Sequence, residues 1–272
     1  MSGAPTTTGP VQGRGDDSEI GVAILGAGFG GLCMAIKLLE AGRRDVVIFE
    51  KAADLGGTWR DNTYPGCACD IPSHLYSFSF EQSPDWSRTY AAQPEILAYL
   101  RRVAVKRGVD RLIRYETPIA RLEWDDDRRL WRLTAADGRQ FVARAVVSAV
   151  GGLHIPKMPD IPGLESFAGP VFHTARWRHD VDLAGRNIAV IGTGTSAAQV
   201  IPALAERAET LAVFQRSPPW VLPRRDRTRS PLARRLQSAL PWLGRLGRAL
   251  RYLRAETAGL AFTGAPRLVG GG

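Results

Sequence analysis

Short apolar runs and helical patterns alternate along the chain, and at two places a glycine-rich turn joins them. Residues 20–25, IGVAIL, form an apolar run rich in β-branched residues, which is typical of a buried parallel strand. A glycine turn follows, then a helical pattern that ends at Gly42, and a second apolar run that ends at Glu50. This order of strand, turn, helix and strand predicts a Rossmann-like unit.

The first turn has the spacing G-x-G-x-x-G. Gly26 permits the tight turn, Gly28 lets the backbone approach a pyrophosphate, and Gly31 allows close packing of helix on strand. Glu50 and Lys51 stand at the ribose end of the unit, where the acid accepts hydrogen bonds from a ribose diol and disfavours a 2′-phosphate. Glycine turns also occur for structural reasons alone, but the full βαβ context favours a dinucleotide, FAD or NAD.

A second unit of the same kind begins at residue 187. Residues 187–191 predict a strand, 197–207 a helix and 210–216 another strand. The candidate phosphate-binding residues of its turn are Gly192, Gly194, Thr195 and Ser196, and Ala197 takes the place of the third glycine. This strand ends in Arg216, which can bond a 2′-phosphate, although a solvated strand-end charge is the alternative. The contrast with Glu50 assigns FAD to the first unit and NADPH to the second.

Residues 56–80, GGTWRDNTYPGCACDIPSHLYSFSF, are rich in glycine and aromatic residues and poor in helix formers. They predict a structured loop near the flavin, with Gly57 approaching the cofactor. Trp59, Tyr64 and Tyr76 could wall the isoalloxazine, and Asp70 is an acid within an otherwise apolar patch. A buried loop whose aromatic side chains only pack fits the same composition.

The remaining patterns connect these units. Residues 92–108 have helical periodicity, and 118–152 predict a β-meander whose last strand returns to the first sheet. Residues 154–163 contain three prolines and predict an extended linker. The fold class expected is α/β, with two Rossmann-like dinucleotide-binding domains, the second incomplete because no third strand follows residue 223.

The loop and the linker together resemble class B flavoprotein monooxygenases of the Baeyer–Villiger branch. The motifs G-G-T-W, N-x-Y-P-G and C-D are found at 56–59, 62–66 and 69–70. The fingerprint F-x-G-x-x-x-H-x-x-x-W is found at Phe167, Gly169, His173 and Trp177. The resemblance covers about residues 20–225. Arg178 follows where the fingerprint has Pro or Asp, so an N- or S-oxygenating flavin monooxygenase remains the alternative.

The resemblance implies that NADPH reduces FAD and that a C4a-peroxyflavin formed from O₂ attacks a ketone, whereas its protonated form oxygenates nitrogen or sulfur. It adds Thr58 to the flavin-binding candidates and makes Asp70 and His173 the catalytic candidates. We expect His173 to hydrogen-bond backbone at the interdomain junction rather than to transfer a substrate proton. The partners implied are O₂ and a small lipophilic substrate such as a ketone.

Composition narrows the alternatives. The net charge of +9 lies within residues 224–272, so the neutral remainder is not expected to bind nucleic acid. No apolar run reaches the ~18–20 residues of a membrane span. Three cysteines fit a reducing cytoplasm, and the C-x-C pair Cys67 and Cys69 is too strained for the disulfide of a flavin disulfide reductase. We interpret both cysteines as structural.

The expected domain organisation has five parts. They are a disordered leader (1–18), an FAD-binding domain (19–155), a linker with the fingerprint (156–184), an NADPH-binding domain (185–223) and a basic helical tail (224–272). Leucines from 232 to 253 recur at helical steps, which favours a solvated or partner-packed helix over one on a membrane surface. The catalytic arginine implied by the resemblance is missing, so we expect a partial chain that is catalytically crippled alone, or a non-catalytic cofactor-binding remnant.

Overall fold

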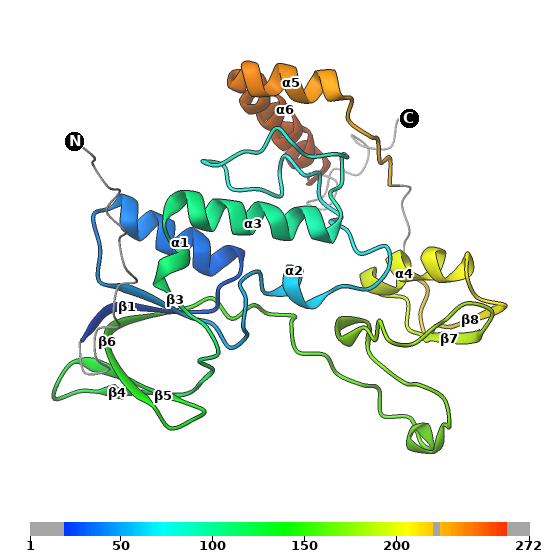
Figure 1. Ribbon diagram of the computed structural model, residues 1–272, viewed down its shortest axis with the longest axis horizontal. Helices are drawn as coiled ribbons and strands as arrows, with labels where there is room; N and C mark the ends of the chain where they lie inside the picture. Colours follow the sequence, from blue (N-terminus) through cyan, green and yellow to red (C-terminus); the bar gives the residue numbers. More distant parts are fainter. Residues whose placement is uncertain (1–18, 220–223, 260–272) are drawn as a thin grey trace, which may run out of the picture. The chain divides into compact units, whose positions relative to one another are not determined.

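The computed structural model describes residues 19–219 and 224–259 (Figure 1). The expected leader at 1–18 and the end of the tail at 260–272 lie outside these residues. The chain divides into two compact units, one formed by the described part of Met1–Asp54 with Gly108–Val150 and the other by Leu55–Arg107 with the described part of Gly151–Gly272. Residues 55–107, which the sequence analysis places in the FAD-binding domain, therefore group with the second unit. The expected domain boundaries remain predictions.

The first unit contains a six-stranded sheet in the order β3-β2-β1-β6-β5-β4. The strands are β1 (Ile20–Leu25), β2 (Val46–Phe49), β3 (Ile113–Arg114), β4 (Ile119–Asp125), β5 (Leu130–Ala135) and β6 (Gln140–Ser148). Helix α1 (Phe29–Glu40) connects β1 to β2. β1 pairs in parallel with β2 and β6, whereas β4, β5 and β6 are antiparallel neighbours. Both the β-meander and the return of its last strand to the first sheet are confirmed.

The sheet centre explains the unbroken apolar run in the sequence. Every residue of β1 is buried, because α1 packs against the strand and side chains such as Leu25 join a core cluster with Phe49 and Phe141. The rings of Phe49 and Phe141 lie 4.8 Å apart, and the Arg114 guanidinium lies 5.2 Å from the Phe141 ring centroid. Packing of this kind fixes the carboxyl end of β1, where the first glycine turn begins.

The second unit carries the second glycine turn between β7 (Asn187–Ile191) and α4 (Thr195–Ala205), and β8 (Thr210–Phe214) pairs in parallel with β7. It also contains α2 (Thr58–Asp61) and α3 (Gln93–Arg107). The strand at 187–191 and the helix at 92–108 are confirmed. α4 begins two residues before the expected start, so Thr195 and Ser196 belong to its first turn.

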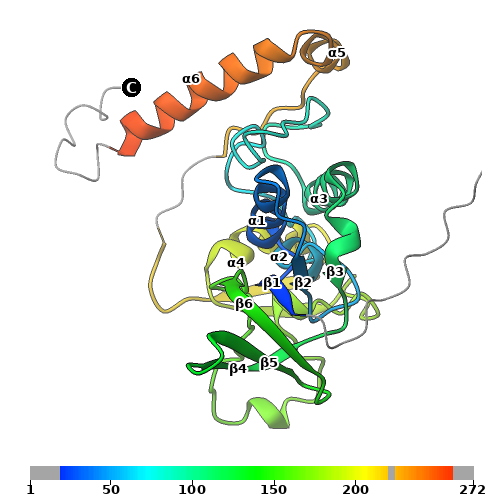
Figure 2. The same cartoon turned by 90° about the vertical axis from the view of Figure 1, so that its left-hand side faces the viewer.

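The leucine-rich tail forms two helices instead of one. They are α5 (Pro231–Ala239) and α6 (Pro241–Gly259), and they run in clearly different directions (Figure 2). Pro241 has no backbone N–H and disfavours helical geometry at the preceding residue, so Leu240 has ψ 76° and the helix breaks there. Within the described ranges, we find no helix with both the length and the apolar character to cross a membrane.

Candidate functional site

The first glycine turn requires glycine at two of its positions. Gly26 has φ +103°, and a Cβ there would lie 2.6 Å from the carbonyl oxygen of Ala149. A Cβ at Gly31 would lie 1.8 Å from the carbonyl oxygen of Gly26. Gly28 begins α1 and no side chain caps it, so an anionic group can approach the first N–H groups of the helix.

Glu50 lies at this turn, as the sequence predicts. Its side chain is buried, with Oε2 accepting a hydrogen bond from the backbone N–H of Ala27 at 2.9 Å and Oε1 accepting one from Ala52 at 3.0 Å. Each carboxylate oxygen can accept more than one hydrogen bond, so the acid can serve the turn and a ribose hydroxyl together. Lys51, the next residue, is exposed, and its contact with a cofactor remains a prediction.

The loop at 56–80 brings two of its predicted flavin neighbours together. Gly57 has φ +53° and begins α2, where Thr58 is exposed. The indole Nε1 of the buried Trp59 donates a hydrogen bond of 3.0 Å to the hydroxyl of Tyr76, and the two rings meet edge to face. Burial raises the pKa of Tyr76, so its hydroxyl stays protonated. Contact of this pair with a flavin remains a prediction.

The two cysteines of this loop are buried thiols. Burial raises the pKa of the Cys67 thiol, and it raises that of Cys69 to about 11. A thiolate is the reactive form of cysteine, so neither side chain suits redox or nucleophilic chemistry near neutral pH. This supports the structural interpretation of both residues.

The second glycine turn is open where the first is packed. At Gly192, with φ +103°, and at Gly194, an added Cβ would meet no heavy atom within 4 Å. Gly194 begins α4, no side chain caps the helix, and Thr195 and Ser196 supply hydroxyls in its first turn. The space in front of this turn and the donors around it fit the phosphates of a dinucleotide.

Arg216 follows the second strand of the same unit. β8 ends at Phe214, two residues before it, and Arg216 is exposed. An exposed guanidinium near the carboxyl end of a parallel strand can pair with a phosphate. Its contact with a 2′-phosphate remains a prediction.

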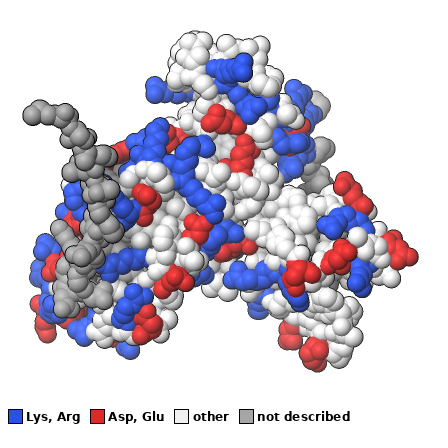
Figure 3. Space-filling model, in the orientation of Figure 1, with Lys and Arg blue, Asp and Glu red and all other residues white. Residues whose placement is uncertain are grey.

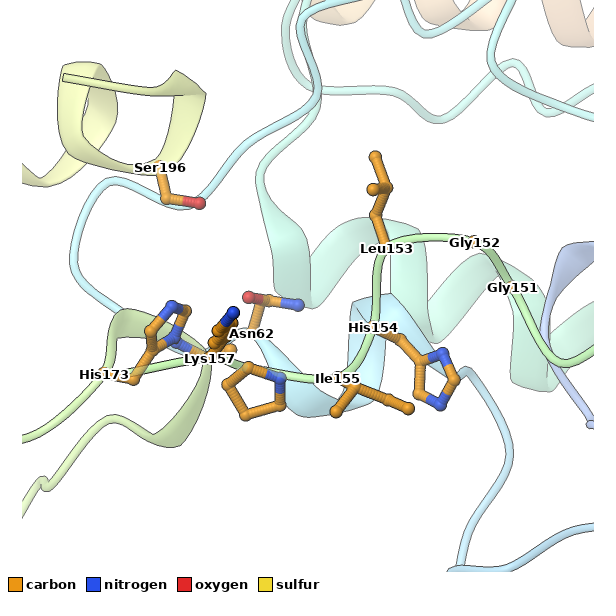
Figure 4. A pocket seen from close by; sticks show the side chains of 11 residues that line it. Asn62, Gly151, Gly152, Leu153, His154, Ile155, Lys157, His173 and Ser196 are labelled. Carbon is orange, nitrogen blue, oxygen red and sulfur yellow. The ribbon is translucent and has the colours of Figure 1, made fainter. Parts of the chain in front are cut away.

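A cavity of about 350 Å³ lies in the second unit beside the start of α4 (Figure 4). Residues 151–157 form one side of it, and Asn62, His173, Ala175 and Ser196 also line it. Lys157, His173 and Ser196 all line this cavity, and Ser196 does so from the first turn of α4. The cavity therefore joins the fingerprint histidine, a lysine and the nucleotide turn in one place.

His173 makes the backbone hydrogen bond expected of it. Its Nδ1 accepts the N–H of Ala175 at 3.0 Å and so caps the short 3₁₀ turn Thr174–Arg176. When neutral, the ring then carries its hydrogen on Nε2. A role at the interdomain junction remains a prediction.

Packing explains the other positions of the fingerprint. The ring of Phe167 covers Gly169, because a Cβ there would lie 2.5 Å from that ring. Trp177 meets Phe172 edge to face at 5.2 Å between centroids. Arg178, which departs from the fingerprint, pairs with Asp180 on the surface.

Two residues that the sequence analysis did not single out line or support these sites. Lys157 lines the cavity together with Asn62, the first residue of the N-x-Y-P-G motif, and Gln199 of α4 hydrogen-bonds the loop that carries Asp70. Gln199 is the one amide in the otherwise apolar middle of its helix, TSAAQVIPALA, which was an available signal. Lys157 gave no such signal, because its linker has no periodicity.

Comparisons with known proteins agree on the kind of protein that the chain resembles. The model of the family described as flavin-binding monooxygenase-like matches residues 19–240. The chain is 48% identical to a Baeyer-Villiger monooxygenase of Streptomyces coelicolor over 252 residues, which are 93% of this chain and 48% of that protein. It is also 48% identical over 248 residues to one of Pseudomonas aeruginosa, covering 91% and 47%.

Comparison with solved structures also finds similarity to flavin monooxygenases. A cyclohexanone monooxygenase from Rhodococcus sp. Phi1 bound to NADP⁺ matches with a TM-score of 0.75 and 39% identity, over 82% of this chain and 43% of that one. The complex of OTEMO with FAD and NADP matches with a TM-score of 0.76 and 33% identity, over 85% and 44%. The chain spans about half the length of the relatives that it matches.

Proposed function

The chain belongs to the flavin-binding monooxygenase-like family, the class B flavoprotein monooxygenases, and we propose that it acts as an NADPH- and FAD-dependent monooxygenase of the Baeyer–Villiger type. The reaction proposed inserts one oxygen atom of O₂ into a ketone to give an ester or lactone. The observation that carries the proposal is the pair of glycine turns with opposite charges beyond them, Glu50 after the first and Arg216 after the second. The names of the relatives in Streptomyces and Pseudomonas support the choice of reaction.

The first turn fits FAD. The uncapped start of α1 would bind its pyrophosphate, and Glu50 would accept a hydrogen bond from its adenosine ribose. In the loop of the second unit, Gly57, Thr58, Trp59 and Tyr76 would contact the isoalloxazine. When bound and reduced, FAD supplies the electrons that activate O₂.

The second turn fits NADPH. Gly192 and Gly194 leave open space for the pyrophosphate, the first turn of α4 supplies N–H and hydroxyl donors, and Arg216 would bind the 2′-phosphate. Lys157, which lines the adjoining cavity, adds a positive charge near an anionic ligand. His173 would orient the chain around this cavity through its backbone hydrogen bond and would not move a substrate proton.

Asp70 would act in the catalytic cycle from the loop at 64–70. Its Oδ1 accepts a hydrogen bond of 2.7 Å from Nε2 of Gln199, which fixes the direction of the carboxylate. A carboxylate held in one orientation can position a cationic partner or accept a proton without reorganising. His173→Ala should uncouple NADPH oxidation from oxygenation more than it weakens flavin binding.

Product analysis tests the reaction. The protein is supplied with FAD, NADPH and O₂ and with either a cyclic ketone or a thioether. A lactone from the ketone supports the proposal, whereas a sulfoxide with no lactone favours the N- or S-oxygenating alternative that Arg178 leaves open. A protein that retains FAD but oxidises no NADPH is a cofactor-binding remnant, and the catalytic proposal then fails.

We also propose a cellular location for the protein and a binding role for its tail. The free thiols Cys33, Cys67 and Cys69 fit a reducing cytoplasm. In the tail, Arg248 of α6 donates to the carbonyl oxygens of His74 and Leu75. The other arginines of α6 and its leucines at 243, 246, 250 and 253 are exposed, and Figure 3 shows basic side chains beside uncharged surface. A protein partner at these exposed leucines is favoured over a membrane surface, and loss of vesicle binding on removal of residues 224–272 would reverse this preference.

A further inference from the structure

The side-chain amide of Gln199 uses all of its hydrogen-bonding capacity on one loop. Its Nε2 donates to the carbonyl oxygen of Ala68 at 2.9 Å and to Oδ1 of Asp70 at 2.7 Å. Its Oε1 accepts from the hydroxyl of Tyr64 at 2.9 Å and from the backbone N–H of Ala68 at 3.2 Å. Two donors and two acceptor positions are therefore satisfied, and the amide has one orientation in this network.

Tyr64 extends the network to the nucleotide turn. Its side chain is buried, and burial raises its pKa to about 12, so the hydroxyl remains a donor near neutral pH. The same hydroxyl interacts with the side chain of Ser196. Ser196 and Gln199 stand one helical turn apart on α4, so both hold the same tyrosine.

The backbone of the loop lies directly against α4. Gly66 has φ +80°, and a Cβ there would lie 2.5 Å from the carbonyl oxygen of Gln199. The N–H of Cys67 closes a turn onto the carbonyl oxygen of Tyr64 at 3.1 Å. Residues 64–70 and the first two turns of α4 thus form one packed body with little freedom for separate motion.

We propose that Gln199 is a positioning residue that couples occupancy of the 192–196 turn to the orientation of Asp70. A dinucleotide that binds this turn orders the start of α4, and Gln199 transmits the order to the loop because it bonds the loop at three residues. This inference rests on the proposed NADPH site and adds to it a link between that site and the proposed catalytic acid. It predicts that NADP⁺ stabilises residues 64–70 although the candidate contacts of the ligand are elsewhere.

Hydrogen–deuterium exchange with and without NADP⁺ tests the coupling. In the unaltered chain, NADP⁺ should slow exchange of the 64–70 amides about 5-fold, the effect of roughly one added hydrogen bond. Gln199→Met keeps the length of the side chain and removes all four bonds, so the loop should exchange faster and the response to NADP⁺ should disappear. NADP⁺ affinity, measured by calorimetry, should fall by no more than about 5-fold, because no contact with the ligand is removed and only the coupling is lost.

Ala198→Met is the matched control. It places the same side chain at the neighbouring exposed position of α4 and should leave the NADP⁺ response intact. Should Gln199→Met not fold, Gln199→Glu keeps the acceptor for Tyr64 but removes the donor to Ala68 and Asp70, and the same loss of response is expected.

The outcomes separate the two proposals. If Gln199→Met retains the NADP⁺-dependent protection, or if NADP⁺ binds the unaltered chain without slowing the loop, then Gln199 is only structural and the coupling is wrong. If the unaltered chain does not bind NADP⁺ at all, the proposed NADPH site fails, and the coupling that rests on it is overturned too.

Discussion

Glu50 and Ala27 are joined across the first glycine turn by a hydrogen bond of 2.9 Å, from the backbone N–H of Ala27 to Oε2 of the buried acid. The acid that directly follows β2 therefore fixes the backbone that follows β1. The residue that we propose to bind a ribose therefore also stabilises the turn that would bind the phosphates. The proposal links FAD binding and stability at this position.

Replacement of Glu50 should reduce stability as well as FAD binding. Glu50→Ala leaves the buried N–H of Ala27 and the half-buried N–H of Ala52 without their acceptor, which costs about 2–4 kcal/mol. Urea denaturation measures the loss. Glu40→Gln, at an exposed helix end, is the control and should change the free energy of unfolding by less than about 0.5 kcal/mol. Equal stability of Glu50→Ala and the unaltered chain would contradict the structural role.

Trp59 and Tyr76 should both be needed to retain FAD. Trp59→Leu and Tyr76→Leu each remove one ring of an edge-to-face pair and break the bond from Nε1 to the hydroxyl. We expect several-fold less FAD per protein after purification, measured by absorbance. Trp124→Leu removes an exposed tryptophan of β4 and should leave the FAD content unchanged. If the control loses as much FAD as the two variants, the aromatic pair has no special role.

His74 should make the second unit less stable in acid. Burial, and then the charges of Arg229, Arg251 and Arg248, lower its pKa from 6.5 to about 4. Between these values the unfolded chain binds a proton that the folded chain does not, so the free energy of unfolding rises with pH across this window and is level above it. The maximum effect is about 3 kcal/mol, at 1.36 kcal/mol per pKa unit.

Denaturation curves at pH 4 to 8 check the direction in which the free energy of unfolding changes with pH. The unaltered chain should lose stability as the pH falls from about 6.5 towards 4, and His74→Asn, which has no titrating group there, should lose measurably less over the same window. An identical slope for the two proteins would show that His74 does not titrate as described.

Arg216 should distinguish NADPH from NADH. Arg216→Gln removes a charge-assisted contact with a 2′-phosphate, worth about 1.5–3 kcal/mol, so NADPH affinity should fall about 10- to 100-fold while NADH affinity stays nearly constant. Calorimetry measures both. Arg207→Gln removes a surface arginine that precedes β8 and pairs with Asp182 at 3.6 Å, and it should change neither affinity. Parallel losses for both nucleotides would rule out 2′-phosphate recognition by Arg216.

Local patterns account for the part of the structure that the sequence predicted. The strands at 20–25 and 187–191, the helix at 92–108 and the β-meander each follow from side chains within a few residues of one another. The break at Pro241 was equally local and could have been predicted, since proline disfavours helical geometry at the residue before it, although α4 continues through Pro202. The sequence analysis expected one helix because the leucines keep their helical spacing on both sides of Pro241.

The contacts that define the sites were not predictable in the same way. Gln199 and Asp70 are 129 positions apart, and no spacing rule connects a helical amide to a loop acid at that separation. The cavity could not be predicted from the sequence either, because Asn62 and His173 come together there only through the tertiary fold. Motifs predicted the candidate residues, whereas the structure showed which of them lie close together.

Gly194 offers the most direct test of the central claim that the second turn binds NADPH. A Cβ at Gly194 meets no protein atom within 4 Å, so Gly194→Ala should fold normally but fill the space that the pyrophosphate needs. Calorimetry with NADPH and with FAD on the unaltered and altered chains is the measurement. The account predicts that Gly194→Ala loses NADPH binding and keeps FAD binding, whereas unchanged NADPH affinity in this variant would contradict it.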